Sequence, residues 1–305
     1  MLLLQLVAVA GFGVLIATLT TIAIQLAGSQ QPQTVVAAGA NTRPGQAATA
    51  AQSAAQAPDA ALTARLNTII AATSARVAVT VVDLGSRPNT RVDIGGSDLF
   101  DAASTYKLPL LMANAENIAN GTYRPSDRIC FKSSEAEDGW FDDYRDGSCF
   151  TRQTLALRAA RYSDNTAGHM LVDNLGGGGA LNTYARKRGA GKSAFFVPNQ
   201  TCAADLAALL VNEASGGTGG QAAQSWLYPL LTKTAFEAGV PAGIPPGVTV
   251  VHKVGAIDST VDDAALVEAP KGAYVVVVMT DLVGGDEAYA LIARISSAVW
   301  AAEAA

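Results

Sequence analysis

The chain has 305 residues, half of them hydrophobic, and a formal net charge of −5. That length allows one large domain or two small ones, and an acidic chain without basic runs disfavours nucleic acid as a partner. There are only two histidines and three cysteines, and no C-x-x-C or H-E-x-x-H spacing, so we expect no metal and no cofactor.

The N-terminal segment is strongly apolar. Residues 2–27 are almost wholly apolar, and no charged side chain precedes Arg43. A membrane-spanning helix needs about 20 apolar residues, whereas a secretory signal has a shorter apolar part behind a positive leader. We therefore expect residues 1–27 to anchor the protein in a membrane, with the remainder outside the cytoplasm. A signal cleaved near the small residues 38–40, which would give a secreted protein, is the alternative.

The next segment predicts a tether. Residues 28–57 are rich in Ala, Gln and Pro and show no apolar period, which is typical of a flexible linker. The folded domain is then expected to span residues 58–305. Nothing in the sequence indicates its oligomeric state.

Secondary-structure signals follow in an informative order. Helical spacing over 58–75 precedes a valine-rich strand at 76–84 and a second strand at 91–96. A helix is expected from residue 104, and mostly helical signals continue to about 240. Three strands, 247–257, 260–269 and 273–282, and a helix over 286–304 end the chain. We predict an α+β fold: an antiparallel sheet of about five strands from both chain ends, terminal helices on one face, and an all-α subdomain at its side.

The three cysteines allow two interpretations. Cys130 and Cys149 bracket a short polar stretch, and Cys202 lies apart. Outside the cytoplasm the first two can form a disulfide, since that compartment is oxidising. Three buried free thiols are the alternative. Because three is an odd number, at least one cysteine remains unpaired.

Residues 102–112, "AASTYKLPLLM", place Ser104 and Lys107 three apart at the start of a helix. Residues at that spacing share a helix face, so the two side chains can touch. A lysine acts as a base only when its pKa is lowered, and the apolar run after Lys107 favours that. An S-x-x-K pair alone has low specificity and is usually structural.

Two further motifs raise the specificity of that pair. Residues 163–165 read S-D-N, and residues 253–255 read K-V-G on an expected strand. S-x-x-K, S-D-N and K-T-G in this order are the signature of class A β-lactamases and penicillin-binding proteins. From about residue 60 to 305 the chain resembles a class A β-lactamase-like serine hydrolase of the penicillin-recognising superfamily. The resemblance implies a β-lactamase/transpeptidase-like fold.

The resemblance implies catalytic roles for four residues. Ser104 would be the nucleophile that forms an acyl-enzyme, and Lys107 its base or proton relay. Ser163 would pass a proton to the leaving nitrogen. Lys253 would bind the substrate carboxylate and help to lower the pKa of Lys107.

The resemblance also implies residues that bind substrate or shape the site. Asn165 would hold the substrate amide, and Asp164 would keep its loop in shape. The backbone N–H groups of Ser104 and Ala256 would form an oxyanion hole, with Gly255 beside them at the substrate.

The sequence departs from the family pattern at two places. No Asp or Glu lies between Asp173 and Asp205, where class A β-lactamases carry the Ω-loop glutamate that activates the deacylating water. His169 replaces the asparagine that supports that glutamate. Val254 replaces the threonine whose hydroxyl binds the substrate carboxylate, so carboxylate recognition should weaken.

We therefore expect a serine hydrolase that acts on β-lactam or D-Ala-D-Ala-like peptidoglycan substrates through an acyl-enzyme and deacylates slowly. A non-catalytic, membrane-tethered domain that binds the cell wall or acts as a scaffold is the alternative. Retention of all three motifs favours the enzyme.

An acidic and aromatic loop, residues 133–148, lies between the first two motifs. In the family this region borders the cleft, so Trp140, Phe141 or Tyr144 are candidates to line it. The alternative is a surface loop whose aromatic side chains pack back onto the domain.

Overall fold

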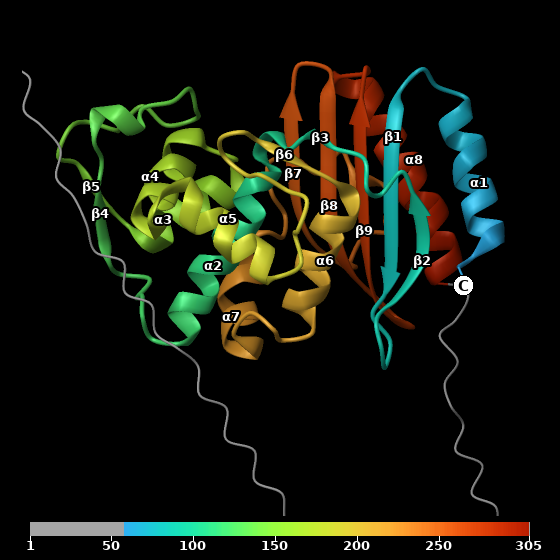
Figure 1. Cartoon of the computed structure of the whole chain (residues 1–305), viewed down its shortest axis with the longest axis horizontal. Helices are drawn as coiled ribbons and strands as arrows, with labels where there is room; N and C mark the ends of the chain where they lie inside the picture. The colour runs from blue at the N-terminus through green and yellow to red at the C-terminus, as the bar shows by residue number, and fades with distance from the viewer. Residues whose placement is uncertain (1–57, 305) are drawn as a thin grey trace, which may run out of the picture. The chain divides into compact units, whose positions relative to one another are not determined.

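The structure is a computed structural model that describes residues 58–304. The expected anchor and linker, residues 1–57, lie outside the described residues, which are the coloured part of Figure 1. Within the described part of the chain, no helix combines the length and the apolar character needed to cross a membrane.

The centre of the domain is a five-stranded antiparallel sheet. Its order is β2 (Asn89–Ile94), β1 (Arg76–Asp83), β9 (Gly272–Asp281), β8 (Thr260–Ala269) and β7 (Thr249–Ile257) (Figure 1). The two ends of the chain meet where β1 pairs with β9. The predicted sheet, built from both chain ends, is therefore confirmed.

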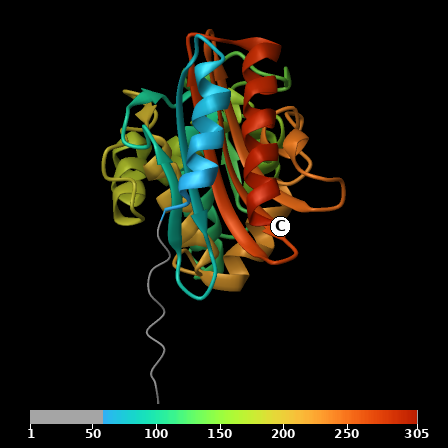
Figure 2. The same cartoon turned by 90° about the vertical axis from the view of Figure 1, so that its right-hand side faces the viewer.

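Two terminal helices cover one face of the sheet, as predicted. α1 (Ala60–Ala71) and α8 (Gly285–Glu303) lie side by side in front of the strands in Figure 2. The Asp59 carboxylate caps α1 by accepting from the backbone N–H of Leu62, one of the first N–H groups, which have no partner within the helix. Leu66 and Ile292 are buried against the sheet valines, each stabilising the fold by roughly 1.5–3 kcal/mol.

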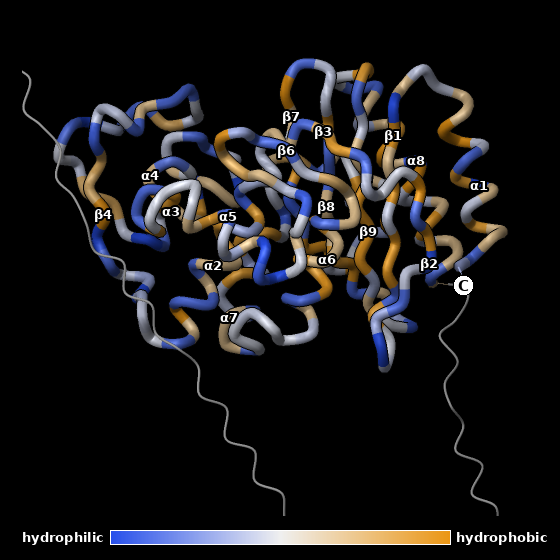
Figure 3. The backbone as a smooth tube through the Cα atoms, viewed as in Figure 1, coloured by the Kyte–Doolittle hydropathy of each residue, from blue (hydrophilic) through white to orange (hydrophobic). Residues whose placement is uncertain are grey.

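The other face of the sheet packs against the helical subdomain. Its helices are α2 (Lys107–Ala119), α3 (Arg152–Arg161), α4 (Asn165–Leu175), α5 (Gly177–Lys187), α6 (Ala203–Ala214) and α7 (Gly220–Leu227). Successive side chains of a strand point to opposite faces, so Val275 and Val277 of β9 join this core while Val276 and Val278 join the other. Burial on both faces explains why the central strands are among the most hydrophobic parts of the tube in Figure 3.

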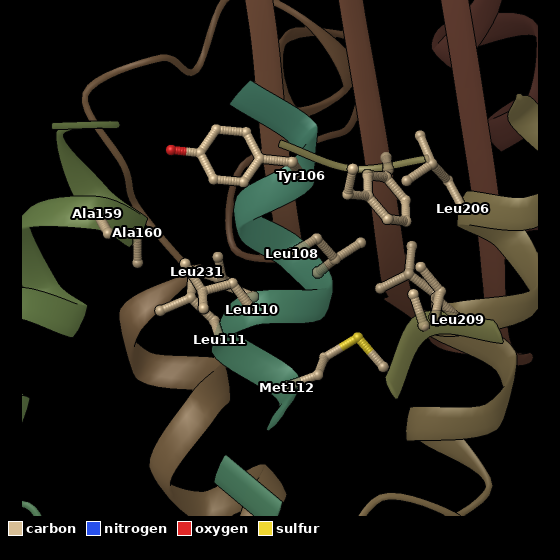
Figure 4. Packing of buried hydrophobic residues seen from close by; sticks show 14 of the residues in the cluster. Tyr106, Leu108, Leu110, Leu111, Met112, Ala159, Ala160, Leu206, Leu209 and Leu231 are labelled. Carbon is tan, nitrogen blue, oxygen red and sulfur yellow. The ribbon is translucent and has the colours of Figure 1, made fainter. Parts of the chain in front are cut away.

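Helix α2 is buried from Lys107 to Ala115. Leu108 and Met112 point toward Leu206 and Leu209 of α6, while Leu111 lies near Leu231 (Figure 4). A helix that is apolar on every side belongs inside a protein core. This packing holds the N-terminus of α2, with Ser104 and Lys107, in a fixed place between the subdomain and the sheet.

Short elements interrupt the region expected to be mostly helical. They are β3 (Phe100–Asp101), β4 (Arg128–Cys130), β5 (Cys149–Thr151), β6 (Gln200–Thr201), η1 (Ala103–Tyr106), η2 (Ser133–Glu135), η3 (Tyr228–Leu230) and η4 (Val240–Gly243). β4 pairs with β5 so that Cys130 lies directly opposite Cys149. These two cysteines form a disulfide, and Cys202 is a buried free thiol. The disulfide alternative is therefore the one the structure confirms.

Candidate active site

The first motif lies at a strained entry into α2. The expected helix start is a 3-10 turn, η1, in which Ala103 has a φ of 40°, a region L-residues rarely adopt. The Asp101 carboxylate accepts from the Ala103 N–H at 2.7 Å, and the Asn199 amide donates to the Ala103 carbonyl at 2.8 Å. This turn directs Ser104 into a cleft and leaves Lys107 behind it.

The side chains of Ser104 and Lys107 are in contact. The Lys107 Nζ donates to the Ser104 Oγ at 2.8 Å and to the Asn165 Oδ1 at 2.7 Å. Burial lowers the pKa of Lys107 to about 7, although the charges of Glu137 and Asp164 oppose that shift. A substantial fraction of the amine is therefore neutral near pH 7 and able to accept the serine proton.

The second motif joins the aromatic loop to α4. The buried Asp164 carboxylate accepts from the N–H of Ala167, where it caps α4, and from the N–H of Trp140 and the hydroxyl of Tyr144. Asn165 also donates from its amide to the carbonyl of Asp138 at 3.0 Å. Asp164 thus occupies the position expected of a residue that shapes the site, and Asn165 lies between Lys107 and the loop.

The third motif runs along β7, the edge strand of the sheet. The Lys253 Nζ donates to the Ser163 Oγ at 3.0 Å and to the Val254 carbonyl at 2.6 Å. Burial, followed by the charge of Lys107, lowers the pKa of Lys253 well below its usual range. For Lys107 itself, burial is the main cause of the lowered pKa.

Gly255 allows β7 to approach the nucleophile turn closely. A Cβ at this position would lie 2.8 Å from the carbonyl oxygen of Ala102 and 3.0 Å from the backbone nitrogen of Thr105. Any larger residue would push β7 away from η1. Ala256, the next residue of β7, lines the same cleft as Ser104.

The expected residues converge on a cleft of about 560 Å³. Its lining comprises Ser104, Asp138, Gly139, Trp140, Tyr162, Ser163, Asn165, Phe236, Val254 and Ala256. The two expected lysines lie directly behind this lining and reach it through the hydroxyls of Ser104 and Ser163.

Only part of the aromatic loop reaches the cleft. Trp140 lines it and is 63% exposed. Phe141 and Tyr144 instead lie under the guanidinium of Arg158, at 4.1 and 5.1 Å from their ring centroids, so for these two the packed-back alternative holds. Tyr162 directly precedes S-D-N and Phe236 belongs to no motif, and neither was singled out from the sequence.

The segment that replaces the Ω-loop presents an aromatic ring. Phe196 packs with its ring centroid 5.0 Å from that of His169 and 5.6 Å from that of Tyr106. The Nδ1 of His169 lies 2.9 Å from the Oε1 of Glu137. Phe196 and His169 therefore form an aromatic wall beside the turn η1.

The second histidine, His252, is not among the residues that line the cleft. His252 is fully buried on the other side of β7, with Nδ1 2.9 Å from the Asp263 carboxylate and Nε2 3.1 Å from Glu237. Burial alone would lower its pKa, but the two carboxylates outweigh burial and raise the pKa to about 9. Charged His252 thus links β7 by ion pairs to Asp263 of β8 and to Glu237 in the segment before η4.

Among residues 58–304, no three His, Cys, Asp or Glu side chains gather in a way that could hold a metal ion.

Comparison with known proteins gives a consistent picture. The sequence model of the family described as "Beta-lactamase enzyme family" matches residues 61–302. A search of curated proteins found no match. A solved structure described as PBP-A is 25% identical, with a TM-score of 0.73, and the alignment covers 81% of this chain and 98% of that one.

Two more solved structures are similar. A mutant of PBP-A, described as an acyl-enzyme complex with penicillin G, is 25% identical with a TM-score of 0.73 and coverage of 79% and 95%. A reconstructed ancestral class A β-lactamase (GNCA) is 25% identical with a TM-score of 0.70 and coverage of 79% and 99%.

Proposed function

Because the chain belongs to the β-lactamase enzyme family, we propose that it is a serine hydrolase that acylates Ser104 with β-lactam or D-Ala-D-Ala-like cell-wall substrates. The observation that carries this proposal is the contact of the Ser104 hydroxyl with Lys107, a buried amine of lowered pKa, at the wall of an open cleft. A pure scaffold has no need of a buried lysine at that place.

Acylation follows from the contacts at the cleft. Neutral Lys107 takes the proton of Ser104 as Oγ bonds to the substrate carbonyl carbon. The developing oxyanion lies at the backbone N–H groups of Ser104 and Ala256. As the carbon–nitrogen bond breaks, the Ser163 hydroxyl gives its proton to the leaving nitrogen, and the proton that Lys107 took from Ser104 restores the Ser163 hydroxyl and leaves Lys107 neutral. The contact of Ser163 with Lys253 keeps the hydroxyl oriented.

Deacylation is proposed to be slow. Water must lose a proton as it bonds to the acyl carbon and the Ser104 ester bond breaks. The sequence has no Asp or Glu between Asp173 and Asp205 to take that proton, and the ring of Phe196 packs beside the nucleophile turn in that segment. A general base typically contributes about 10²–10⁴-fold, so its loss prolongs the acyl-enzyme by a comparable factor.

We also propose that the domain works outside the cytoplasm, tethered through residues 1–27. The apolar character of residues 2–27 favours an anchor. The Cys130–Cys149 disulfide favours an oxidising compartment, since cytosolic thiols are kept reduced.

Intact-mass spectrometry of the full chain mixed with benzylpenicillin tests the proposal. We expect a mass increase equal to the whole penicillin, retained for minutes to hours. Ser104→Ala should remove it, while Ser86→Ala, which changes an exposed turn serine, should keep it.

Three other outcomes separate the alternatives. Product without a lasting adduct would mean that water is activated by another route, so slow deacylation would be wrong and the hydrolase right. An adduct that survives Ser104→Ala would place the nucleophile elsewhere. Absence of adduct and product with penicillins, acyl-D-Ala-D-Ala peptides and neutral thioesters alike would favour the scaffold.

A further inference from the structure

The charge around the cleft is negative. Among the described residues that line it, Asp138 is the only Asp, Glu, Lys or Arg. A second hollow shares Asp138 and Asn165 with the cleft lining and adds Glu137. Both carboxylates lie on the exposed aromatic loop, so an anionic substrate approaches against their field.

Neither catalytic lysine offsets this charge at the cleft surface. The side chain of Lys253 is 1% exposed, and its Nζ donates to two protein acceptors, the Ser163 Oγ and the Val254 carbonyl. Burial and the charge of Lys107 lower the pKa of Lys253, so a cationic form is disfavoured there. Lys107 likewise donates to Ser104 and Asn165.

Away from the polar groups of Ser104, Ser163 and Asn165, the wall of the cleft is formed by aromatic and aliphatic side chains. The Trp140 ring lies 6.2 Å from both the Tyr162 and the Phe236 ring centroids. Val254 separates Lys253 from Gly255 in the third motif and presents methyl groups to the cleft beside Ser163. A carboxylate pressed against such a wall loses hydration without gaining a charged partner, whereas an aromatic or aliphatic group gains from burial.

From these contacts we infer that the cleft selects acyl donors without a carboxylate, whose leaving portion is uncharged and apolar and packs against Trp140, Phe236 and Val254. This inference rests on the proposed function, since it concerns what the same serine accepts. It narrows the substrate class from carboxylate-bearing β-lactams and peptides toward neutral esters, thioesters or amide-capped analogues.

A matched pair of thioesters tests the inference on the full chain. Both carry the same phenylacetylglycyl group. One has thioglycolate as its leaving group, which bears a carboxylate, and the other has the methyl ester of thioglycolate, which is neutral. The Ser104 oxygen bonds to the carbonyl carbon, the carbon–sulfur bond breaks, and the thiol leaves with the serine proton. Released thiol gives the acylation rate constant, which is divided by each thioester's hydroxide-catalysed rate to remove intrinsic reactivity.

We expect the neutral thioester to acylate Ser104 at least about tenfold faster after this correction, a difference of about 1.4 kcal/mol. Val254→Thr keeps nearly the same side-chain shape and adds a hydroxyl, so it should reduce the ratio of the acylation rate of the neutral thioester to that of the carboxylate thioester. Asp138→Asn should reduce this ratio as well. Val254→Ile, which keeps the wall apolar, should leave the preference for the neutral thioester in place.

The outcomes are separable. Equal or faster acylation by the carboxylate thioester, with the adduct on Ser104, would overturn this inference and leave the proposed function standing. No Ser104-dependent acylation by either thioester or by benzylpenicillin would overturn both. A ratio that is unchanged in Val254→Thr and in Asp138→Asn would also overturn the inference, because these residues are its stated cause.

Discussion

The two sides of Ser104 differ in chemical character: one is polar and hydrogen-bonded, and the other is aromatic. On one side, hydrogen bonds connect Lys107 to Ser104 and Asn165, and Lys253 to Ser163. On the other, the ring of Phe196 packs against the rings of Tyr106 and His169. Under the proposed function, the difference separates the two halves of a hydrolytic cycle: the polar side would serve acylation, and the aromatic side would be where deacylation is slow.

Removing the Ser104 hydroxyl should have the largest effect on the acylation rate and tests whether the polar side acts through this oxygen. Ser104→Ala should lower the acylation rate by roughly 10⁴-fold or more, since the other groups act only through this oxygen. The rate of adduct formation with benzylpenicillin, followed by intact mass, measures the effect. Ser86→Ala serves as the control and should acylate at the wild-type rate. A residual rate within tenfold of the wild type would mean that the polar network serves another nucleophile.

The pH dependence of acylation sharpens the role of the polar side. Lys107 is a base only when neutral, and burial lowers its pKa to about 7. The rate should therefore approach a tenfold fall per pH unit below 7 and level off above it, which is roughly 50-fold between pH 7 and pH 5. A neutral thioester is the suitable substrate, because it has no ionisable group in this range.

Removing a negative charge near Lys107 tests whether this lysine causes the fall in acylation rate below pH 7. The charge of Glu137 raises the pKa of Lys107, so Glu137→Gln should move the midpoint of the pH dependence of the acylation rate to lower pH. Asp142→Asn, on the same exposed loop, is the matched control and should leave the midpoint in place. A rate that is flat from pH 5 to 9 would contradict a lysine base.

The buried hydrogen bonds of Asp164, on the polar side, should also contribute more to the free energy of unfolding than an exposed carboxylate of the loop does. Asp164 is buried and accepts hydrogen bonds from Ala167, Trp140 and Tyr144. Asp164→Ala leaves these donors without their acceptor, so the free energy of unfolding should fall by roughly 3 kcal/mol. Urea denaturation measures it. The exposed Asp138→Ala on the same loop should change stability by less than about 0.5 kcal/mol, and an equal loss in both variants would contradict the argument.

The polar side was predictable from sequence and the aromatic side was not, for a physical reason. Ser104 and Lys107 are three residues apart on one turn, so the local pattern already brings them together. Alternating and valine-rich runs likewise predict the sheet, because both encode strand burial. Phe196 and Phe236 belong to no local pattern, and long-range packing alone brings them to the site.

Two further positions show the same limit. The sequence left the pairing of Cys130 open, and the register of β4 against β5 decides it. Tyr144 was a candidate for the cleft wall, but its hydroxyl donates to Asp164 and Arg158 lies over its ring, so it faces the domain. Both outcomes depend on partners that lie far along the chain.

Placing a carboxylate on the aromatic side should give that side a base for deacylation. Phe196 is half-buried beside His169 and the turn that carries Ser104, so Phe196→Glu introduces a base where the described segment presents only a ring. We expect the acyl-enzyme formed with benzylpenicillin to decay about tenfold faster or more. This is less than the full 10²–10⁴-fold of a well-placed general base, because the new side chain lacks evolved partners.

Phe196→Gln separates the base from the space it occupies. Glutamine has the shape of glutamate but cannot take a proton from water, so it should leave the decay of the acyl-enzyme near the wild-type rate. The decay is followed by intact mass after excess penicillin is removed. If glutamine and glutamate accelerate decay equally, the ring of Phe196 slows hydrolysis by excluding water. If neither does, the slow step lies outside this side of the cleft, and the contrast between the two sides does not govern turnover.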